Sequence, residues 1–294
     1  MGTRVAILGT GRMGSAIARR LAESGIDVTL WSRTRAHAES VGLGRVADTP
    51  AEAAGAADVV ISSLTGADAL RAVYLGHDGA IEASTGQTFV DMSTAGSDVV
   101  AELEPPIAAR GSHFLAVPIL GAPTVVAAGK GTLLAGGDER TVERARPVLD
   151  LLGTVRYVGS VTSAARLKLV ANSMLAAVME AAAELQVAGE GAGLDPGDVF
   201  WVLSRLVPGL EARRAGLIEG RHEPALFALS DLNKDVDLAQ ALFSRSAGRM
   251  PVVRKAADLI GVAALANPDL DISAVSLPYR DPERSSAGDT RPLA

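Results

Sequence analysis

The spacing of hydrophobic positions changes near residue 162 and divides the chain into two parts. In the first part, short apolar runs alternate with stretches in which apolar residues recur every three or four positions, a pattern that predicts strands alternating with helices. The expected strands cover residues 3–8, 27–31, 58–63, 88–92, 113–118, 132–135 and 156–158. Such an alternation indicates an α/β fold with a mostly parallel, doubly wound sheet.

The second part lacks the strand pattern and predicts helices separated by glycine and proline. They are expected at 163–192, 195–206, 209–219, 230–247 and 251–266. Asp195 before Pro196 is a clear helix start, with a capping carboxylate followed by proline at the first helical position. We therefore expect an N-terminal α/β domain over 1–161 and an all-α domain over 162–280. Residues 281–294, rich in Pro, Ser, Gly and charge, read as a tail.

The helix expected near 163–189 carries the first candidate for chemistry. Its broad apolar face is expected to be buried and is formed by Leu167, Val170, Met174, Val178 and Leu185. Lys168 and Asn172 stand one turn apart, so their side chains share a face. Burying either group unpaired is costly. Lys168 is therefore either a solvated lysine at a helix edge or a residue used for chemistry.

Composition excludes several function classes. The chain has no cysteine, four scattered histidines and a formal net charge of −6, which argues against disulfides, a metal site and a nucleic-acid surface. With 48% hydrophobic residues, 294 residues can bury a sizeable core. No apolar run is long enough to span a bilayer, and the N-terminus lacks a signal pattern. We expect a soluble, cytoplasmic protein without metal, nucleic-acid or membrane partners.

A glycine-rich segment follows the first expected strand and precedes a helix. It reads Gly9-Thr10-Gly11-Arg12-Met13-Gly14, the G-x-G-x-x-G spacing in the context that dinucleotide binding requires. Gly9 permits a tight turn, Gly11 lets the backbone approach a pyrophosphate, and Gly14 lets the helix pack closely on the strand. The helix N-terminus offers N–H groups to the anion. This segment, with Arg12 and Met13 inside it, predicts a Rossmann-type dinucleotide site.

The end of the second expected strand indicates which dinucleotide is bound. Sites for NAD usually carry an acid here to hold the ribose 2′-hydroxyl, whereas this chain has Ser32, Arg33 and Thr34. A guanidinium and two hydroxyls suit a 2′-phosphate. We therefore expect NADP(H) to be preferred over NAD(H). Ligands of such sheets sit beyond the carboxyl ends of the strands, where the turns Leu64-Thr65 and Ser93-Thr94 fall.

The ordered set of segments resembles the β-hydroxyacid dehydrogenases, the family of 3-hydroxyisobutyrate dehydrogenase, tartronate semialdehyde reductase and 6-phosphogluconate dehydrogenase. The resemblance spans residues 3–279. It is carried by the glycine motif and by four further segments: Asp91-Met92-Ser93-Thr94, Val117 to Ala122, Lys168 with Asn172, and Asn233-Lys234-Asp235-Val236-Asp237-Leu238-Ala239.

The resemblance implies a role for each matching position. Lys168 would be the general acid/base, and Asn172 would hold the substrate or the lysine. Leu64, Thr65, Thr94 and Lys234 would contact the cofactor, with Lys234 supplied by the helical domain. Substrate contacts would come from Ser93, Thr94, Leu120, Gly121, Asn172 and Asp235. The implied activity is NADPH-dependent hydride transfer to or from a small carbonyl or 3-hydroxyacid, in a homodimer or dimer-based oligomer.

Two departures from the family pattern bear on the substrate. Leu120-Gly121-Ala122 replaces a usual Ser-Gly-Gly whose serine helps hold a carboxylate, and Leu64-Thr65 replaces a usual Leu-Pro. The substrate is therefore expected to be less acidic, or more apolar, than a simple 3-hydroxy acid. Imine reductases share the architecture and form the alternative, although they usually replace the lysine and carry more aromatic residues. A catalytically silent nucleotide-binding or interaction protein is the alternative from another class.

Overall fold

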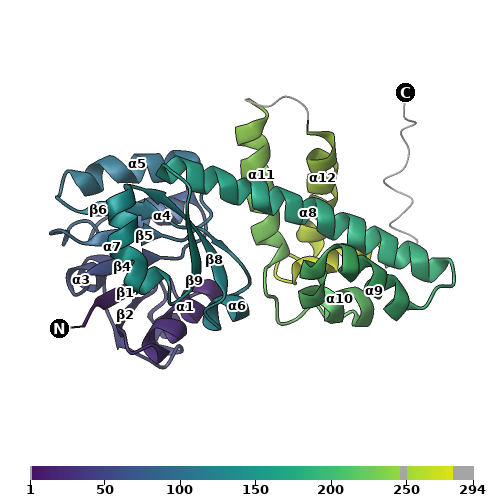
Figure 1. Ribbon diagram of the computed structural model, residues 1–294, viewed down its shortest axis with the longest axis horizontal. Coiled ribbons are helices and arrows are strands. Elements are labelled where there is room, and N and C mark those ends of the chain that lie inside the picture. The colour runs from purple at the N-terminus through teal and green to yellow at the C-terminus, as the bar shows by residue number, and fades with distance from the viewer. Residues whose placement is uncertain (1, 246–249, 281–294) are drawn as a thin grey trace. The chain divides into compact units, whose positions relative to one another are not determined.

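The computed structural model describes residues 2–245 and 250–280 (Figure 1). The chain forms two compact units, Met1–Leu169 and Val170–Ala294. Their boundary falls inside one helix, α8 (Val161–Gly191). The tail expected over 281–294 lies outside the described residues.

The first unit is built on one twisted sheet. Its strands are β1 Arg4–Leu8, β2 Asp27–Trp31, β3 Arg45–Val46, β4 Val59–Ser62, β5 Thr88–Asp91, β6 His113–Ala116, β7 Ile119–Leu120, β8 Gly131–Gly137 and β9 Gly153–Tyr157. The order is β3-β2-β1-β4-β5-β6-β8-β7, with β9 paired to β8. Strands β1 to β6 pair in parallel. The predicted mostly parallel α/β sheet is confirmed.

The far edge of the sheet is mixed, which the sequence pattern did not indicate. Strand β8 runs antiparallel to both β6 and β7, and β9 then pairs with β8 in parallel. Residues 136–137 of β8 pair with β6, and residues 132–133 pair with β7. Because β8 is long enough to pair with both, Ile119 and Leu120 form a short strand where none was expected.

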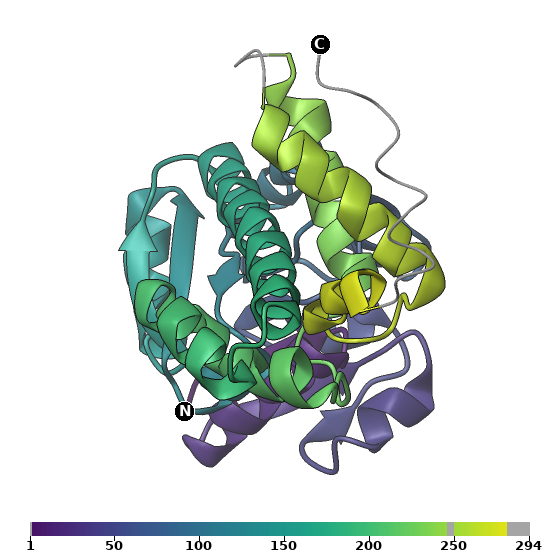
Figure 2. The same cartoon turned by 90° about the vertical axis from the view of Figure 1, so that its right-hand side faces the viewer.

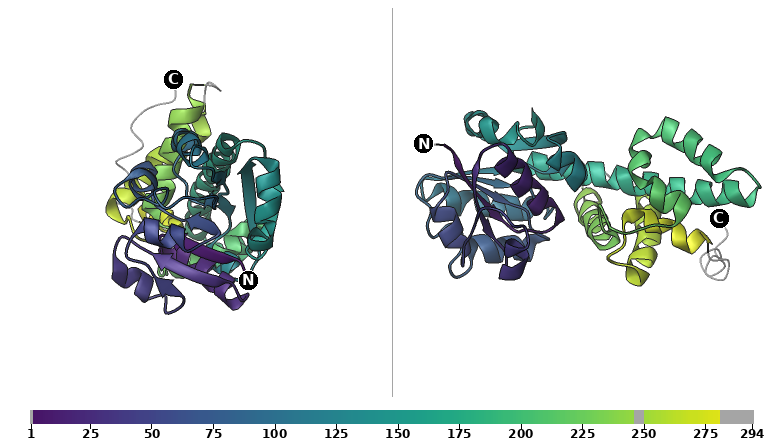
Figure 3. Two further views of the ribbon diagram at one scale, coloured as in Figure 1. Left: turned by 90° about the vertical axis from the view of Figure 1, so that its left-hand side faces the viewer. Right: turned by 90° about the horizontal axis from the view of Figure 1, so that it is seen from below.

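Helices cover both faces of the sheet (Figure 3). Alternate residues of β1 point into separate cores, Val5 and Ile7 into one, Ala6 and Leu8 into the other, as the period of two in a strand requires. The first core receives α1 Arg12–Glu23, α2 Arg35–Glu39, α6 Pro123–Ala127 and α7 Glu139–Leu149. The second receives α3 Pro50–Gly55, α4 Ala67–Leu75, α5 Ser97–Ala108 and the start of α8.

The second unit is all-helical. It contains the later part of α8, α9 Pro196–Leu206, the 3₁₀ helix η1 Pro208–Arg213, α10 Arg214–Glu219, α11 Leu229–Phe243, α12 Pro251–Ala266, the 3₁₀ helix η2 Ile272–Ser276 and α13 Leu277–Arg280. Helices α11 and α12 lie side by side (Figure 2). The single α-helix expected over 209–219 is wrong, because a 3₁₀ turn opened by Pro208 occupies its first half. Residues 246–249, at the end of the expected helix 230–247, lie outside the described part.

The face of α8 that we expected to be buried is exposed in the chain. Met174 is 64% exposed, and Leu167, Val170 and Leu185 are exposed as well. The buried face is lined mainly by small and flexible side chains, among them Ala176, Met179, Ala182 and Ala183. Alanine allows close helix packing, so the large apolar side chains of this helix point outward.

A buried acid joins α8 to the end of the described chain. Glu180 is 5% exposed, and the Tyr279 hydroxyl donates to its Oε2 at 2.9 Å. Its Oε1 has no hydrogen-bond partner among the residues that the structure describes. Burial raises the pKa of Glu180 to about 7. Arg280, the residue after Tyr279, also contacts α8, because it pairs with Glu190 of that helix at 2.6 Å.

None of the helices in residues 2–245 and 250–280 combines the length and apolar character needed to cross a membrane.

Candidate active site

The turn after β1 has the shape of a phosphate cradle. Gly9 has φ +99°, and a Cβ there would lie 2.3 Å from the Ser63 carbonyl oxygen. A Cβ on Gly14 would lie 1.9 Å from the Gly9 carbonyl oxygen, so both positions exclude a side chain. A Cβ on Gly11 would meet nothing within 4 Å. The missing side chain at Gly11 therefore leaves open space above the turn, as a bound pyrophosphate requires.

Helix α1 begins directly at this turn. Gly11 is its N-cap and provides no side-chain cap, and no acid occupies the first turn. The first N–H groups and the positive end of the helix dipole are thus available to an anion. Arg12 is exposed, while Met13 packs against the sheet core. These residues fit a dinucleotide pyrophosphate.

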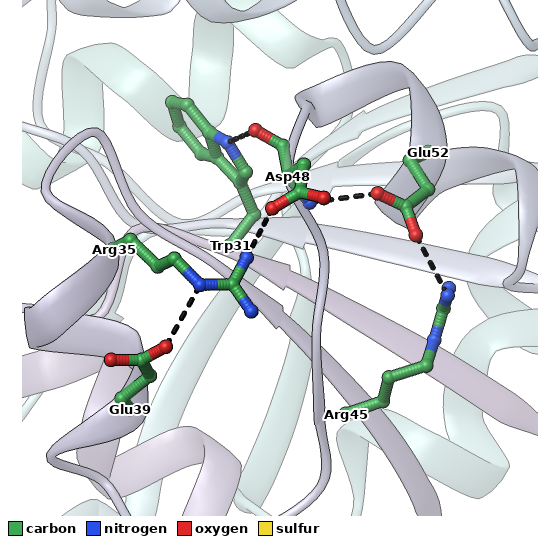
Figure 4. A network of polar contacts seen from close by, with 6 residues as sticks. All are labelled: Trp31, Arg35, Glu39, Arg45, Asp48 and Glu52. Atoms are coloured by element: carbon green, nitrogen blue, oxygen red, sulfur yellow. Dashed lines mark hydrogen bonds and ion pairs between the residues drawn. The ribbon is translucent and has the colours of Figure 1, made fainter.

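The segment after β2 holds a network of charged side chains (Figure 4). Arg35 pairs with Glu39 at 2.8 Å and also with Asp48. The Trp31 indole donates to the Asp48 carbonyl oxygen at 3.3 Å. Arg45 pairs with Glu52 at 2.8 Å and extends the network.

Arg33 differs from these arginines. It is exposed and makes no hydrogen bond or ion pair with any residue that the structure describes. Ser32 is half-buried and Thr34 exposed on either side of it. Arg35 and Arg45 have carboxylate partners, so Arg33 differs from them in having none among the described residues.

The turns after β4 and β5 are tied together. The Leu64 N–H donates to Ser93 Oγ at 2.9 Å, and the Ser93 N–H donates to Asp91 Oδ1 at 3.1 Å. Thr65 is exposed on its turn, whereas Ser93 and Thr94 are half-buried. The structure therefore brings Leu64 and Ser93 together at the carboxyl ends of adjacent strands, where ligands of parallel sheets bind.

Lys168 lies beside the same strand ends. Its Nζ donates to the Ile119 carbonyl oxygen at 2.7 Å, next to Leu120. A small cavity of about 10 Å³ is lined by ten residues that include Asp91, Ser93, Thr94, Pro118 and Lys168. Leu120 is half-buried and Gly121 exposed. The predicted lysine, serine and threonine thus share one cavity.

The remaining predicted residues meet within the second unit. Asn172 is 3% exposed, and its Nδ2 donates to Asp235 Oδ2. Asp235 is also buried and pairs with Lys234. Lys234 lines a groove of about 570 Å³ between α11 and α12, together with Ser230 and other residues of these helices. The assigned roles of Asn172, Lys234 and Asp235 toward ligands stay predictions.

The side chains behind the β4 and β5 turns were not predicted from the sequence. Ser62 donates to Asp91 Oδ1 at 2.7 Å, and Tyr74 is hydrogen-bonded to Ser62 at 2.8 Å. All three are buried. The available signal was an acid at the end of an otherwise apolar strand, Thr88 to Asp91, because a buried strand that ends in aspartate needs donors for it.

Two family descriptions cover most of the chain. Residues 4–162 match the NAD-binding domain of 6-phosphogluconate dehydrogenase. Residues 162–279 match the NAD-binding region of NADP-dependent 3-hydroxyisobutyrate dehydrogenase. Both matches agree with the order of segments on which the resemblance rests.

Individual relatives support the same assignment. The chloroplastic glyoxylate/succinic semialdehyde reductase 2 of Arabidopsis thaliana is 31% identical over 279 residues, which cover 92% of this chain and 78% of that protein. The structure of 3-hydroxyisobutyrate dehydrogenase from Mycobacterium tuberculosis, solved with L-serine, aligns with TM-score 0.81 at 28% identity, covering 96% of this chain and 100% of that chain.

A third neighbour shares the fold alone. An imine reductase from Pseudomonas sp. aligns with TM-score 0.66 at 20% identity, over 94% of this chain and 98% of that chain. The chain belongs to the β-hydroxyacid dehydrogenase family of nicotinamide-dependent oxidoreductases.

Proposed function

We propose that this protein is an NADPH-dependent reductase, or 3-hydroxyacid dehydrogenase, acting on small carbonyl or 3-hydroxyacid substrates with Lys168 as general acid/base. The observation that carries the proposal is the position of Lys168. Its Nζ is held by the Ile119 carbonyl, and the side chain lines one cavity with Ser93 and Thr94. A lysine fixed at the carboxyl ends of the strands lies where the substrate would bind. There it can donate the proton that the substrate's carbonyl oxygen needs on reduction.

Different residues of the chain would bind the cofactor and transfer the proton. The Gly9–Gly14 turn and the start of α1 would hold the pyrophosphate, and Arg33 the 2′-phosphate. When bound, the reduced dinucleotide supplies hydride to the carbonyl carbon. Lys168, as an ammonium, donates a proton to the oxygen as negative charge develops there. The bond to Ile119 fixes the direction of the lysine side chain.

Leu120 bears on the substrate class. It stands where relatives place a serine that holds a carboxylate, and it is half-buried beside Ile119, whose carbonyl binds Lys168. An apolar side chain there favours aldehydes or semialdehydes over small, strongly acidic 3-hydroxy acids. The same feature favours imine reduction as the second candidate, because an imine substrate needs no carboxylate contact.

A substrate panel tests the proposed function. Purified protein is mixed with NADPH and with aldehydes, semialdehydes, keto acids or cyclic imines, and the absorbance of the reduced nicotinamide is followed. We expect turnover of aldehydes or semialdehydes. Turnover of imines alone would replace the proposal by imine reduction. Tight NADPH binding without turnover of any substrate would favour a catalytically silent nucleotide-binding protein.

Arg33→Ala is expected to weaken NADPH binding about ten- to a hundredfold, the loss of one charge-assisted contact to phosphate. NADH binding should change little, because NADH lacks the 2′-phosphate. Fluorescence titration of both cofactors measures the two affinities. Arg45→Ala is the matched control, since Arg45 is paired with Glu52 nearby. Equal losses for NADPH and NADH in Arg33→Ala would show that Arg33 does not read the 2′-phosphate.

We also propose that the protein forms a homodimer or a dimer-based oligomer. Large apolar side chains of the second unit are exposed in the single chain, including those of Val170, Met174, Leu185, Trp201 and Leu206. Burial of these side chains against a partner would be favourable, and the simplest partner is a second copy of the chain. Light scattering should give at least twice the chain mass of 30.1 kDa, and Met174→Glu should weaken the assembly. A monomer at micromolar concentration would contradict the proposal.

A further inference from the structure

A buried carboxyl group connects the two turns of the candidate site. Asp91 ends β5 and is 1% exposed. Its Oδ1 accepts hydrogen bonds from Ser62 Oγ at 2.7 Å and from the Ser93 N–H at 3.1 Å. Ser93 Oγ in turn accepts from the Leu64 N–H. One oxygen of Asp91 therefore fixes the turn that carries Ser93 and Thr94 and, through Ser93, the turn after β4.

The donors in this network have a definite direction. A serine hydroxyl has one proton, and Ser62 gives it to Asp91. The hydroxyl of Tyr74, which is fully buried on α4, must then donate to Ser62 across their 2.8 Å contact. Among the described residues, both hydrogen bonds given for this carboxyl group thus end on Oδ1.

The second oxygen of Asp91 has a different environment. Oδ2 is buried and has no hydrogen-bond partner among the described residues. An ionised carboxylate would leave a charged oxygen without a donor in the protein interior, which is costly. Burial raises the pKa of Asp91, against the opposing effect of the hydrogen bonds from Ser93 and Ser62. A protonated carboxyl group avoids this cost because Oδ2 then becomes a donor.

A small cavity beside the carboxyl group can hold an acceptor for the proton on Oδ2. Asp91 lines the cavity that also involves Ser93, Thr94 and Lys168, and its volume is about 10 Å³. A cavity of roughly this size holds one water molecule when polar groups surround it. Because Oδ1 already accepts two hydrogen bonds, Oδ2 is the oxygen that remains to form a hydrogen bond in this cavity.

We propose that Asp91 is a positioning residue that works as a neutral carboxylic acid, with Oδ1 holding the Ser93–Thr94 turn and the Oδ2 proton directed into the cavity that Lys168 also lines. Its kinetic consequences rest on the proposed reductase function. A neutral acid places no negative charge beside the substrate oxygen, which itself gains negative charge as the hydride arrives. Lys168 then has no ionised Asp91 near it to compete with that oxygen for its proton.

Two substitutions at Asp91 separate shape from charge. Asparagine keeps an acceptor at the Oδ1 position and a donor at the Oδ2 position, the pattern of the neutral acid. Asp91→Ala removes both. We expect Asp91→Ala to lower kcat about 10- to 100-fold through misplacement of the Ser93–Thr94 turn, with NADPH affinity within a few fold. Asp91→Asn should rescue kcat to within about threefold of wild type. Ser62→Ala, which removes one donor to Oδ1, should fall between them.

Each contrary outcome overturns a stated part of the proposal. If Asp91→Asn loses as much kcat as Asp91→Ala, the site needs the ionised carboxylate, and the neutral acid is wrong. If Asp91→Ala keeps wild-type kcat and loses only thermal stability, Asp91 has a purely structural role.

An infrared measurement tests the protonation state without any substrate. At neutral pH the full chain should show the carbonyl stretch of a protonated carboxyl group, and this band should persist in Glu180→Gln, which removes a second buried acid whose pKa is raised. The buried acids Asp235 and Asp271 are paired with Lys234 and Arg213, which favour their ionised forms. Asp91→Asn should remove the band. Absence of the band in Glu180→Gln would overturn the proposal whether or not the substrate panel supports a reductase, so the two failures are distinguishable.

Discussion

Lys168→Met is expected to lower kcat about 10²–10⁴-fold on the best substrate, the range typical of removing a general acid/base. Methionine keeps the length and much of the volume of the side chain but has no proton to give. NADPH affinity should stay within a few fold, because the glycine turn and Arg33 hold the dinucleotide in the proposed site. Steady-state turnover and fluorescence titration of NADPH measure the two quantities.

Lys130→Met is the matched control for this substitution. Lys130 is an exposed lysine of the same unit and has no part in the proposed site, so both kcat and cofactor affinity should match wild type. If Lys168→Met also keeps wild-type turnover, the lysine has no part in the chemistry. Imine reduction would then become the leading interpretation, since an imine nitrogen that arrives protonated requires no acid.

Glu180→Gln is expected to stabilise the protein at alkaline pH and to have little effect near pH 5. The pKa of Glu180 is about 7 in the folded chain, against an ordinary value of 4.5. Between these values the folded state binds more protons than the unfolded state, so stability falls as pH rises through this window. The difference in pKa corresponds to about 3 kcal/mol, which is fully lost above about pH 8.

Chemical denaturation of both proteins at about pH 5 and about pH 8.5 measures most of this effect, because most of the window between the ordinary value of 4.5 and about 7 lies between them. Glutamine mimics the protonated acid, so the variant should lose most of the pH dependence that wild type shows. Glu211→Gln is the control, since Glu211 is exposed and lies in the same unit. An unchanged slope in Glu180→Gln would mean that Glu180 is ionised and solvated in the folded protein.

The central strands and the glycine turn were predictable because local sequence determines them. Apolar runs bounded by turn residues placed β1, β2, β4 and β5 within a residue or so of their observed bounds. The two-residue strand Ile119–Leu120 was not predictable, because its pairing depends on how far β8 extends. The face of α8 that the single chain buries was also not predictable. Periodicity shows that a helix has an apolar side, but the packing partner decides whether alanine or the larger residues are buried.

The candidate site was predictable only in part. Lys168, Ser93 and Thr94 were named from the sequence, and the structure places them around one cavity. The resemblance supplied their roles, since periodicity left open whether Lys168 is a solvated lysine. The contact of Lys168 with a backbone carbonyl gave no sequence signal. The network behind Asp91 left one sequence signal, an acid at the end of an apolar strand, but its donors come from two other elements and could not be named.

The three glycines of the first turn differ in how much mutation each can accept. At Gly9 and Gly14 even a methyl group would collide with backbone, so a substitution there damages the fold and any ligand site together. Gly11 has φ −67° and open space around it, so the protein itself would accept alanine. Only a molecule seated on the turn would meet the new methyl group. Gly11→Ala, which adds a single methyl group, is therefore expected to give a folded reference protein that binds the cofactor poorly.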